Sequence, residues 1–278
     1  MAIATPTLLT AGQDLANLSR YTIPASGLLS FVSGRFYVLG TETDMGTGDA
    51  MSSYTVGIIG DSAVFSFGSY GNFADDDDIA YWTFAPAANY SNVSLHVHSN
   101  AGSQSNLRWG LVEVAYGFNR SAVTKQAQFF TSSASAYVNH NLSSAPDSDS
   151  VTIVFAVNST DNVAHSPFNY TELGEGGTGG GGSDGGNSSI GYASPAVSNS
   201  STALASGTGD FGAWVLEIDA NAGAASDDAL VRFGSMDYAD GSGLVTADFT
   251  GGAAATIYDG GYYLRRRRLD DLTAFEEV

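Results

Sequence analysis

The sequence contains no cysteine and a single lysine, Lys125, and these shortages exclude several classes of protein. Without cysteine the chain has no disulfide, no thiolate metal site and no cysteine nucleophile. No apolar run approaches the roughly 18 residues that a membrane-spanning helix needs, so we expect no membrane insertion. The opening residues MAIATPTLLTAGQDL lack a basic region followed by an apolar stretch, so we expect no signal peptide.

Positive charge is scarce along the whole chain. Ten Lys and Arg residues stand against 29 Asp and Glu residues, which gives a formal net charge of −19. A surface of this sign repels phosphate groups, so we expect no nucleic-acid partner. An acidic surface almost free of lysine also stays hydrated at high salt, where charge repulsion is screened. A halophilic or marine source and an ordinary acidic protein both fit this composition.

Short β-branched and aromatic segments alternate with glycine, asparagine and serine along most of the chain. This pattern is typical of many short strands joined by tight turns, and no long segment has the periodicity of an amphipathic helix. The clearest strand segments are GRFYVLGTE, SYTVGIIG, DIAYWTFAP, NVSLHVHS, LRWGLVEVAYGF, SVTIVFAVNS and FGAWVLEIDA. We predict an all-β protein, built as an antiparallel β-sandwich of jelly-roll type.

Two parts of the chain repeat the same order of features. PAANYSNVSL begins at Pro86, PAVSNSSTAL begins at Pro195, and each segment ends on a leucine. Downstream, WGLVEV places Glu113 near its end and AWVLEI places Glu217 near its end. A duplication of this length, without the short period of a solenoid, predicts two similar halves packed as one sandwich.

The chain divides into three predicted parts. Residues 1–20 form an extended N-terminal arm, and residues 21–220 form the sandwich of two similar halves. Residues 221–278 form a strand-rich assembly tail that ends in a basic block and a short helix. Strands in such a tail can pair with a sheet of a neighbouring subunit.

The order of motifs resembles a β-sandwich family of virion proteins from tailed viruses of bacteria and archaea. The resemblance is carried by VTIVFAVNST, by FNYTELGEGGTGG with its glycine-rich loop, and by the closing segment GDFGAWVLEIDA. It spans roughly residues 20–220, and the loop from Gly174 to Gly186 is richer in glycine than the family pattern. The resemblance implies a sandwich in a particle, of tail-fibre or head-decoration type, and it implies no catalytic residues.

Two clusters have side chains that bind metals. Asp75, Asp76, Asp77 and Asp78 form a run of carboxylates, which suit a hard cation such as Ca²⁺. The spacing and central glycine of an EF-hand are missing, so a solvated turn explains the run as well. The histidines of the segment NVSLHVHS share one strand face and can bind a transition metal if a third ligand joins them. Two exposed polar residues on an outward face are the alternative.

Paired carboxylates are the residues that hydrolyse glycosidic bonds. Glu113 and Glu217 occupy equivalent places in the two halves, so duplication accounts for the pair without catalysis. The glycine loop lacks the Lys-Ser/Thr and the helix of a phosphate-binding loop, and we interpret it as a flexible surface loop. We therefore expect no enzymatic activity and no cofactor other than possible Ca²⁺ at the aspartate run.

Four of the ten basic residues stand together near the C-terminus, and they are followed by LDDLTAFEEV. Forked guanidinium groups bind carboxylates, so the block suits an acidic partner such as another copy of this chain. A ten-residue helix with an apolar stripe is not stable alone and needs a partner surface. We predict that the block and the stripe dock during assembly; a frayed, solvated tail is the alternative. The docking residues are Arg265, Arg266, Arg267, Arg268, Leu269, Leu272 and Phe275.

Two surface features bear on sugars. Asn-x-Ser/Thr occurs more often than composition predicts, either because the asparagines carry glycans or because turns are rich in Asn and Ser. The sites are Asn17, Asn89, Asn92, Asn119, Asn141, Asn158, Asn169, Asn187 and Asn199. Tyrosines near turns can stack on sugars, although packing in the core or at an edge is the simpler explanation for each. They are Tyr70, Tyr90, Tyr116 and Tyr192.

These observations lead to one expected function and one alternative. We expect a non-enzymatic structural protein exposed on the outside of a virion and assembled in the host cytoplasm, as a head decoration, turret or tail-fibre component. Its partners are then copies of itself, other virion proteins and possibly a host surface glycan. The alternative is a carbohydrate-binding adhesin or receptor-binding protein of a virus or a cell surface.

Overall fold

The computed structural model describes residues 5–44, 53–73, 77–99, 104, 106–115, 121–159, 163–177, 186–221, 235–239 and 244–248. These residues form strands joined by turns, and no α-helix occurs among them. The strands pair antiparallel, so the prediction of an all-β antiparallel sandwich is confirmed. The chain divides into one compact unit of residues 1–117 and 121–220 and a second unit of 118–120 and 221–278.

The first half of the sandwich contains the strands β1 to β10. Its larger sheet has the order β1-β10-β4-β7-β6, a smaller sheet has the order β2-β9-β5, and β3 pairs with β8. The strands are β1 (Thr7–Asp14), β2 (Arg20–Ile23), β3 (Leu29–Phe31), β4 (Phe36–Asp44), β5 (Tyr54–Ile58), β6 (Ser66–Phe73), β7 (Asp77–Phe84), β8 (Tyr90–Val93), β9 (Leu95–Ser99) and β10 (Leu107–Val114).

The second half repeats this arrangement strand for strand. Its larger sheet has the order β11-β18-β13-β16-β15 and its smaller sheet has the order β12-β17-β14. The strands are β11 (Ser121–Ser135), β12 (Tyr137–Asn141), β13 (Val151–Asn158), β14 (His165–Phe168), β15 (Thr171–Glu175), β16 (Asn187–Ala193), β17 (Asn199–Leu204) and β18 (Gly209–Asn221). Each half distributes successive strands between two sheets, as a jelly-roll sandwich does.

The register makes the two halves equivalent residue by residue. Glu113 of β10 pairs with Tyr37 of β4, and Glu217 of β18 pairs with Thr152 of β13. Three residues further along β4 and β13, Gly40 and Phe155 are therefore equivalent positions. This agrees with the duplication read from the sequence.

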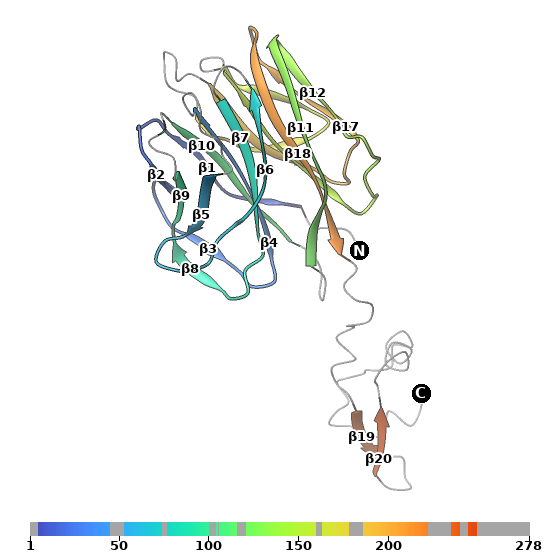
Figure 1. Cartoon of the computed structure of the whole chain (residues 1–278). Helices are drawn as coiled ribbons and strands as arrows, with labels where there is room; N and C mark the ends of the chain where they lie inside the picture. The colour runs from blue at the N-terminus through green and yellow to red at the C-terminus, as the bar shows by residue number, and fades with distance from the viewer. Residues whose placement is uncertain are drawn as a thin grey trace. The chain divides into compact units, whose positions relative to one another are not determined.

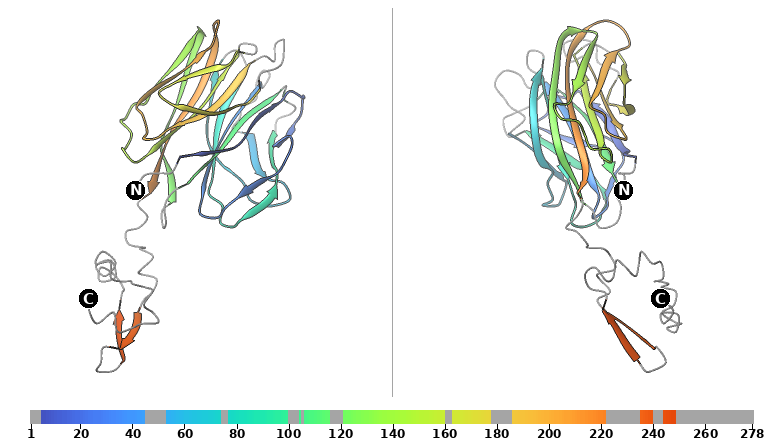
Figure 2. Two further views of the ribbon diagram at one scale, coloured as in Figure 1. Left: turned by 180° about the vertical axis from the view of Figure 1, so that it is seen from behind. Right: turned by 90° about the vertical axis from the view of Figure 1, so that its right-hand side faces the viewer.

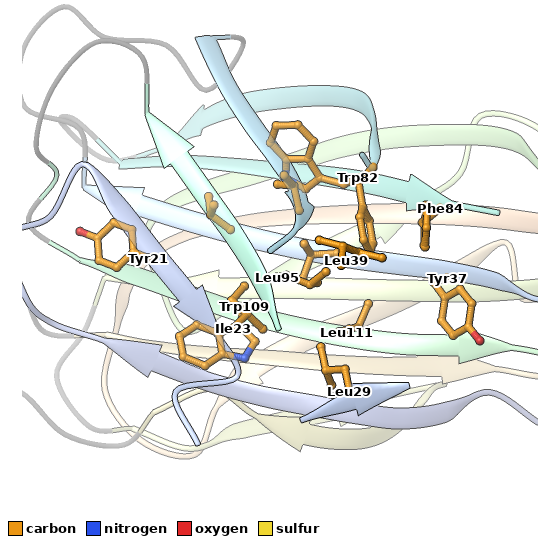
Figure 3. Close-up of a cluster of buried hydrophobic side chains, with 14 of the residues drawn as sticks. Tyr21, Ile23, Leu29, Tyr37, Leu39, Trp82, Phe84, Leu95, Trp109 and Leu111 are labelled. Carbon is orange, nitrogen blue, oxygen red and sulfur yellow. The ribbon is translucent and has the colours of Figure 1, made fainter. Parts of the chain in front are cut away.

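Three apolar cores separate four layers of sheet (Figures 1 and 2). The first core lies between the larger and smaller sheets of the first half, where Trp82 and Trp109 face Ile23 and Leu95 (Figure 3). The second core lies between the two larger sheets, and the third lies between the sheets of the second half. Both larger sheets are thus covered on both faces, which explains why β13 is buried at every position.

Glycines let the two larger sheets approach closely. A side chain at Gly40 would place its Cβ 2.1 Å from the Phe155 ring, and one at Gly110 would lie 2.7 Å from Ile190. The equivalent of Gly110 is Trp214, which packs edge-on against a tyrosine at 4.9 Å between ring centroids. At equivalent positions, therefore, one half supplies glycine and the other supplies a large ring.

The strand directions give the sandwich two distinct ends. β1 begins at Thr7 beside Glu113, and β18 runs past the pairing of Ile218 with Val151 to finish at Asn221, so both lie at what we call the terminal end. At the opposite end, β15 and β16 are joined through the glycine-rich stretch. The sequence analysis treats residues 1–20 as an arm, but Thr7–Asp14 form β1, an edge strand of the larger sheet. β19 (Ser235–Ala239) and β20 (Leu244–Asp248) form a two-stranded hairpin in the second unit.

Candidate functional site

The predicted aspartate site is only partly within the described residues. Asp75 and Asp76 lie outside them, while Asp77 and Asp78 open β7 opposite β4 and β6. Asp78 is buried, and its carboxylate accepts a hydrogen bond from Asn72 Nδ2 at 3.1 Å. No group of three or more His, Asp or Glu side chains suited to a metal ion occurs in the described part of the chain. The aspartate run therefore remains a prediction for Ca²⁺, carried by the sequence alone.

The two histidines of β9 lie on the outer face of the small sheet β2-β9-β5, as the alternation predicts. Their neighbours in register are not carboxylates: His98 pairs with Arg20 and Thr55, and His96 pairs with Thr22 and Gly57. Burial and then the charges of Arg20 and His98 lower the pKa of His96. The described neighbours thus make this face cationic and supply no third metal ligand.

The paired glutamates lie on opposite sides of the two larger sheets. Glu113 has the orientation of Leu111, which faces the first core, and Glu217 has that of Val215, which faces the third. Tyr37 OH donates to Glu113 at 2.9 Å, and Gln126 Nε2 donates to Glu217 at 2.7 Å. Packed sheets are about 10 Å apart, so these carboxylates do not converge on one cleft.

A buried ion pair lies between the two halves. Arg108 of β10 and Glu42 of β4 face each other across the ladder at 2.8 Å, with side chains 3% and 1% exposed. Gly186 leaves space for the guanidinium, because a Cβ there would lie 3.4 Å from its central carbon. Sequence reasoning did not single out this pair. In a chain with ten basic residues, one arginine is thus held at the interface of the halves.

Two buried histidines lie within the third core. His165 contacts Ser189 Oγ through Nδ1 and Asn158 Nδ2 through Nε2, both at 2.6 Å. His140 contacts Ser200 Oγ through Nδ1 at 3.0 Å. Because an amide nitrogen only donates, Nε2 of His165 is an acceptor and its ring is neutral. Burial lowers the pKa of His165 to about 3 and that of His140 to about 4.

The His165 cluster contains the residue types of a catalytic triad, but its place in the fold excludes that role. Ser189 is 1% exposed and Asn158 is 0% exposed, so no substrate reaches the serine in the folded chain. The equivalent of His165 in the first half is Ile58, which faces the corresponding core. The cluster is therefore a satisfied polar network inside an otherwise apolar core.

The outer face of the small sheet β12-β17-β14 differs from its counterpart. Tyr137 of β12 is 50% exposed and Phe168 of β14 is 62% exposed, although both are large rings. Between them the outward residues are Asn139 and Ser201, which pair directly in register. The sequence analysis listed other tyrosines: Tyr70 is 40% exposed, Tyr90 and Tyr192 are partly buried against cores, and Tyr116 lies outside the described residues. The alternation in YVNHN was the signal that marks Tyr137 as outward-facing.

The Asn-x-Ser/Thr sites separate into buried and exposed groups. Asn158 and Asn187 are 0% exposed, so their side chains cannot carry a glycan in the folded chain. Asn199 is exposed and pairs in register with Asn141, and its carboxamide oxygen accepts from Asn169 at 3.3 Å. The other exposed sites are Asn17, Asn89 and Asn92, and Asn119 lies outside the described residues. Exposed sites thus cluster at one corner of the small sheet β12-β17-β14.

Exposed apolar side chains gather in the first half, in the segments next to β3 and the β5–β6 turn. Leu28 and Val64 are both 60% exposed, and Val32 and Ile59 are each more than 40% exposed. The backbone nitrogen of Ile59 donates to Ser94 O, and Ser94 follows Val93, the partner of Leu29. These segments connect strands at the terminal end.

The predicted docking residues Arg265, Arg266, Arg267, Arg268, Leu269, Leu272 and Phe275 all lie outside the described residues. The same holds for the short helix predicted after them. In the described part of the chain, no helix is long and apolar enough to cross a membrane.

Comparison with known proteins does not place the chain in a family. No family model, no curated protein and no solved structure matches it. The resemblance to tailed-virus sandwich proteins therefore rests on the sequence motifs, and the function must be argued from the two ends and the outer faces of the sandwich.

Proposed function

We propose that this chain is a non-enzymatic structural protein displayed on the surface of a virus particle and assembled through its terminal end and C-terminal tail. The observation that carries the proposal is the polarity of the sandwich. β1 begins and β18 finishes at the terminal end, and four exposed apolar side chains lie on segments that connect strands there. An exposed apolar patch of this kind marks a surface that packs on a partner.

The chemistry of the described residues also supports a structural role. The glutamates that would act as an acid pair face different cores, and the histidine with a serine neighbour is buried. The polar side chains that are most able to react are thus bound to one another inside the fold. Shape, oligomer contacts and exposed surfaces are what such a protein has to offer.

Assembly is tested by size-exclusion chromatography with light scattering on the full chain and on a chain that ends at Gly261. We expect an oligomer that falls to monomer on truncation. A second variant replaces Arg265, Arg266, Arg267 and Arg268 with serine, and a third carries Leu28→Ser and Val64→Ser. Each should lower the oligomer without changing the circular dichroism of the sandwich. A full chain that is monomeric at every concentration would contradict the proposal.

The particle context is tested separately. Antibodies against the sandwich should label the outside of purified virus particles from the source organism in electron micrographs. Recovery of the protein only from the soluble fraction, with particles free of it, would leave the alternative of an adhesin. That alternative is favoured by one observation, the pair of exposed rings on the outer face of β12-β17-β14.

A further inference from the structure

The two small sheets expose outer faces of different chemistry, although they are equivalent in the fold. The face of β2-β9-β5 presents Arg20, His96 and His98. The face of β12-β17-β14 presents no charged residue at any of its outward positions. These positions are Tyr137, Asn139, Asn141, Asn199, Ser201, Ala203, Ser166 and Phe168. We call this second surface the neutral face. On a chain of net charge −19, an uncharged surface of this size favours an uncharged partner.

The rings of the neutral face flank a polar strip. Tyr137 pairs with Ala203, and Phe168 pairs with Ser201 on the other side of the same strand. With strands about 4.8 Å apart and a rise of about 3.4 Å per residue, their Cα atoms are about 12 Å apart. Between them lie carboxamides and hydroxyls, which donate and accept hydrogen bonds equally well.

From this arrangement we propose that the neutral face binds an uncharged oligosaccharide chain. The apolar faces of the sugar rings would lie on Tyr137 and Phe168, and the sugar hydroxyls would bond the amides between them. Rings are suited to this role because they offer contact area and little loss of side-chain freedom. The spacing of the two rings calls for a chain of several sugar units rather than a single ring.

The proposal does not depend on the particle assignment. The neutral face lies on the outer layer of the second half, whereas the assembly proposal uses the terminal end and the tail (Figure 1). Sugar binding and oligomer formation can therefore fail independently. The face also differs from the exposed asparagine sites, because binding is measured on protein made in a bacterial host that attaches no N-glycan.

The test is affinity electrophoresis of the full chain through gels that contain one uncharged polysaccharide each: dextran, mannan, laminarin or galactan. Wild type should be retarded by at least one of them. Tyr137→Ala combined with Phe168→Ala should weaken that binding at least tenfold. The matched control is Phe67→Ala with Tyr70→Ala, which removes two exposed rings from β6 and should leave binding unchanged. Unchanged thermal unfolding in both double variants shows that the fold is retained.

Salt and assembly separate the proposal from its competitors. Binding to a neutral chain should persist from about 0.1 to about 1 M NaCl, where the Debye length falls from about 10 to about 3 Å. Three results would overturn the proposal: no retardation by any neutral polysaccharide, equal loss in both ring variants, or binding confined to anionic heparin or alginate. A lower oligomer in Tyr137→Ala with Phe168→Ala would also overturn it, because the face would then be a contact between copies.

Discussion

The two halves share one topology and differ in what they bury. The first half fills its core with aromatic and aliphatic side chains, and Trp82 and Trp109 are its largest members. The second half fills the equivalent space partly with polar groups around His140 and His165. The difference teaches that strand order alone sustains the fold, while the polarity of the core is free to vary when each buried polar group has a partner.

A second difference lies where the halves meet. Equivalent positions carry glycine in the first half and a large ring in the second, as at Gly40 and Phe155. A symmetric pair of first halves would leave gaps at these positions, and a symmetric pair of second halves would collide. The interface is therefore specific for one copy of each half.

The comparison breaks most severely if the same ring stands on both sides of the interface. Gly40→Phe places a second phenyl ring where Phe155 already lies, and we expect a loss of more than about 3 kcal/mol or no folded protein. Soluble yield and thermal unfolding measure the effect. Because the two positions are equivalent, Gly40→Phe with Phe155→Gly should recover part of the stability. A swap variant no better than Gly40→Phe would refute the equivalence.

The buried ion pair offers the next largest effect. Arg108→Met leaves Glu42 charged and buried without its arginine, so we expect a loss of about 3–5 kcal/mol in the free energy of unfolding. Arg108→Met with Glu42→Leu removes both charges and should lie close to wild type. Urea unfolding measures both variants. If the single and double variants lose the same amount, the charges are not the cause.

Acid should weaken the second half more than the first. The unfolded chain takes up protons on His140 and His165 below their ordinary pKa of 6.5, while the folded chain does so only near pH 4 and pH 3. Stability from these groups is full above pH 6.5 and falls as the pH drops towards 4 and 3. Between pH 7 and pH 5 we expect a loss of about 4 kcal/mol from the pair.

Two measurements check the acid effect. His165→Asn should remove about half of the pH dependence of urea unfolding between pH 7 and pH 5. Hydrogen exchange should show β17 losing protection before its equivalent, β9. Equal loss of protection in both strands would mean that the histidines do not set the difference between the halves.

The smallest expected effect compares the two equivalent glutamates. Glu217 is 1% exposed and accepts from Gln126 Nε2 and from the backbone of Asp147, so Glu217→Ala should lose about 2–3 kcal/mol. Glu113 is more exposed and holds Arg35 at 3.3 Å, so Glu113→Ala should lose less than about 1 kcal/mol. Thermal unfolding of the two variants, side by side, decides this. Equal losses would show that equivalence in the fold outweighs burial.

The strands and the duplication were readable from the sequence because both depend on local patterns. The apolar run VTIVFAVN marks a strand buried on both faces, and the Pro-Ala segments mark the same turn in each half. β1 was missed because TLLTAGQD has weak alternation and gains its place by pairing with β10. Tertiary pairing of this kind leaves no signal in a short segment.

Less of the candidate surface was predictable. The listed tyrosines were chosen for their nearness to turns, whereas the exposed rings of the neutral face lie on strands at the edges of a small sheet. Which rings share a face depends on which strands pair, and β12 and β14 are brought together only through β17. The partners of His165 come from β13 and β16 and were hidden for the same reason.

The glycine-lined face of the first half has a consequence for synthesis. That face is complete once β10 has left the ribosome at Val114, but the strands that cover it end near Ile218. At about 5–20 residues per second, it stays open for roughly 5–20 seconds on the nascent chain. During that interval the nascent first half exposes Phe36, Val38 and Val112 to neighbouring ribosomes and chaperones. Expression yield should therefore depend on translation speed through the second half.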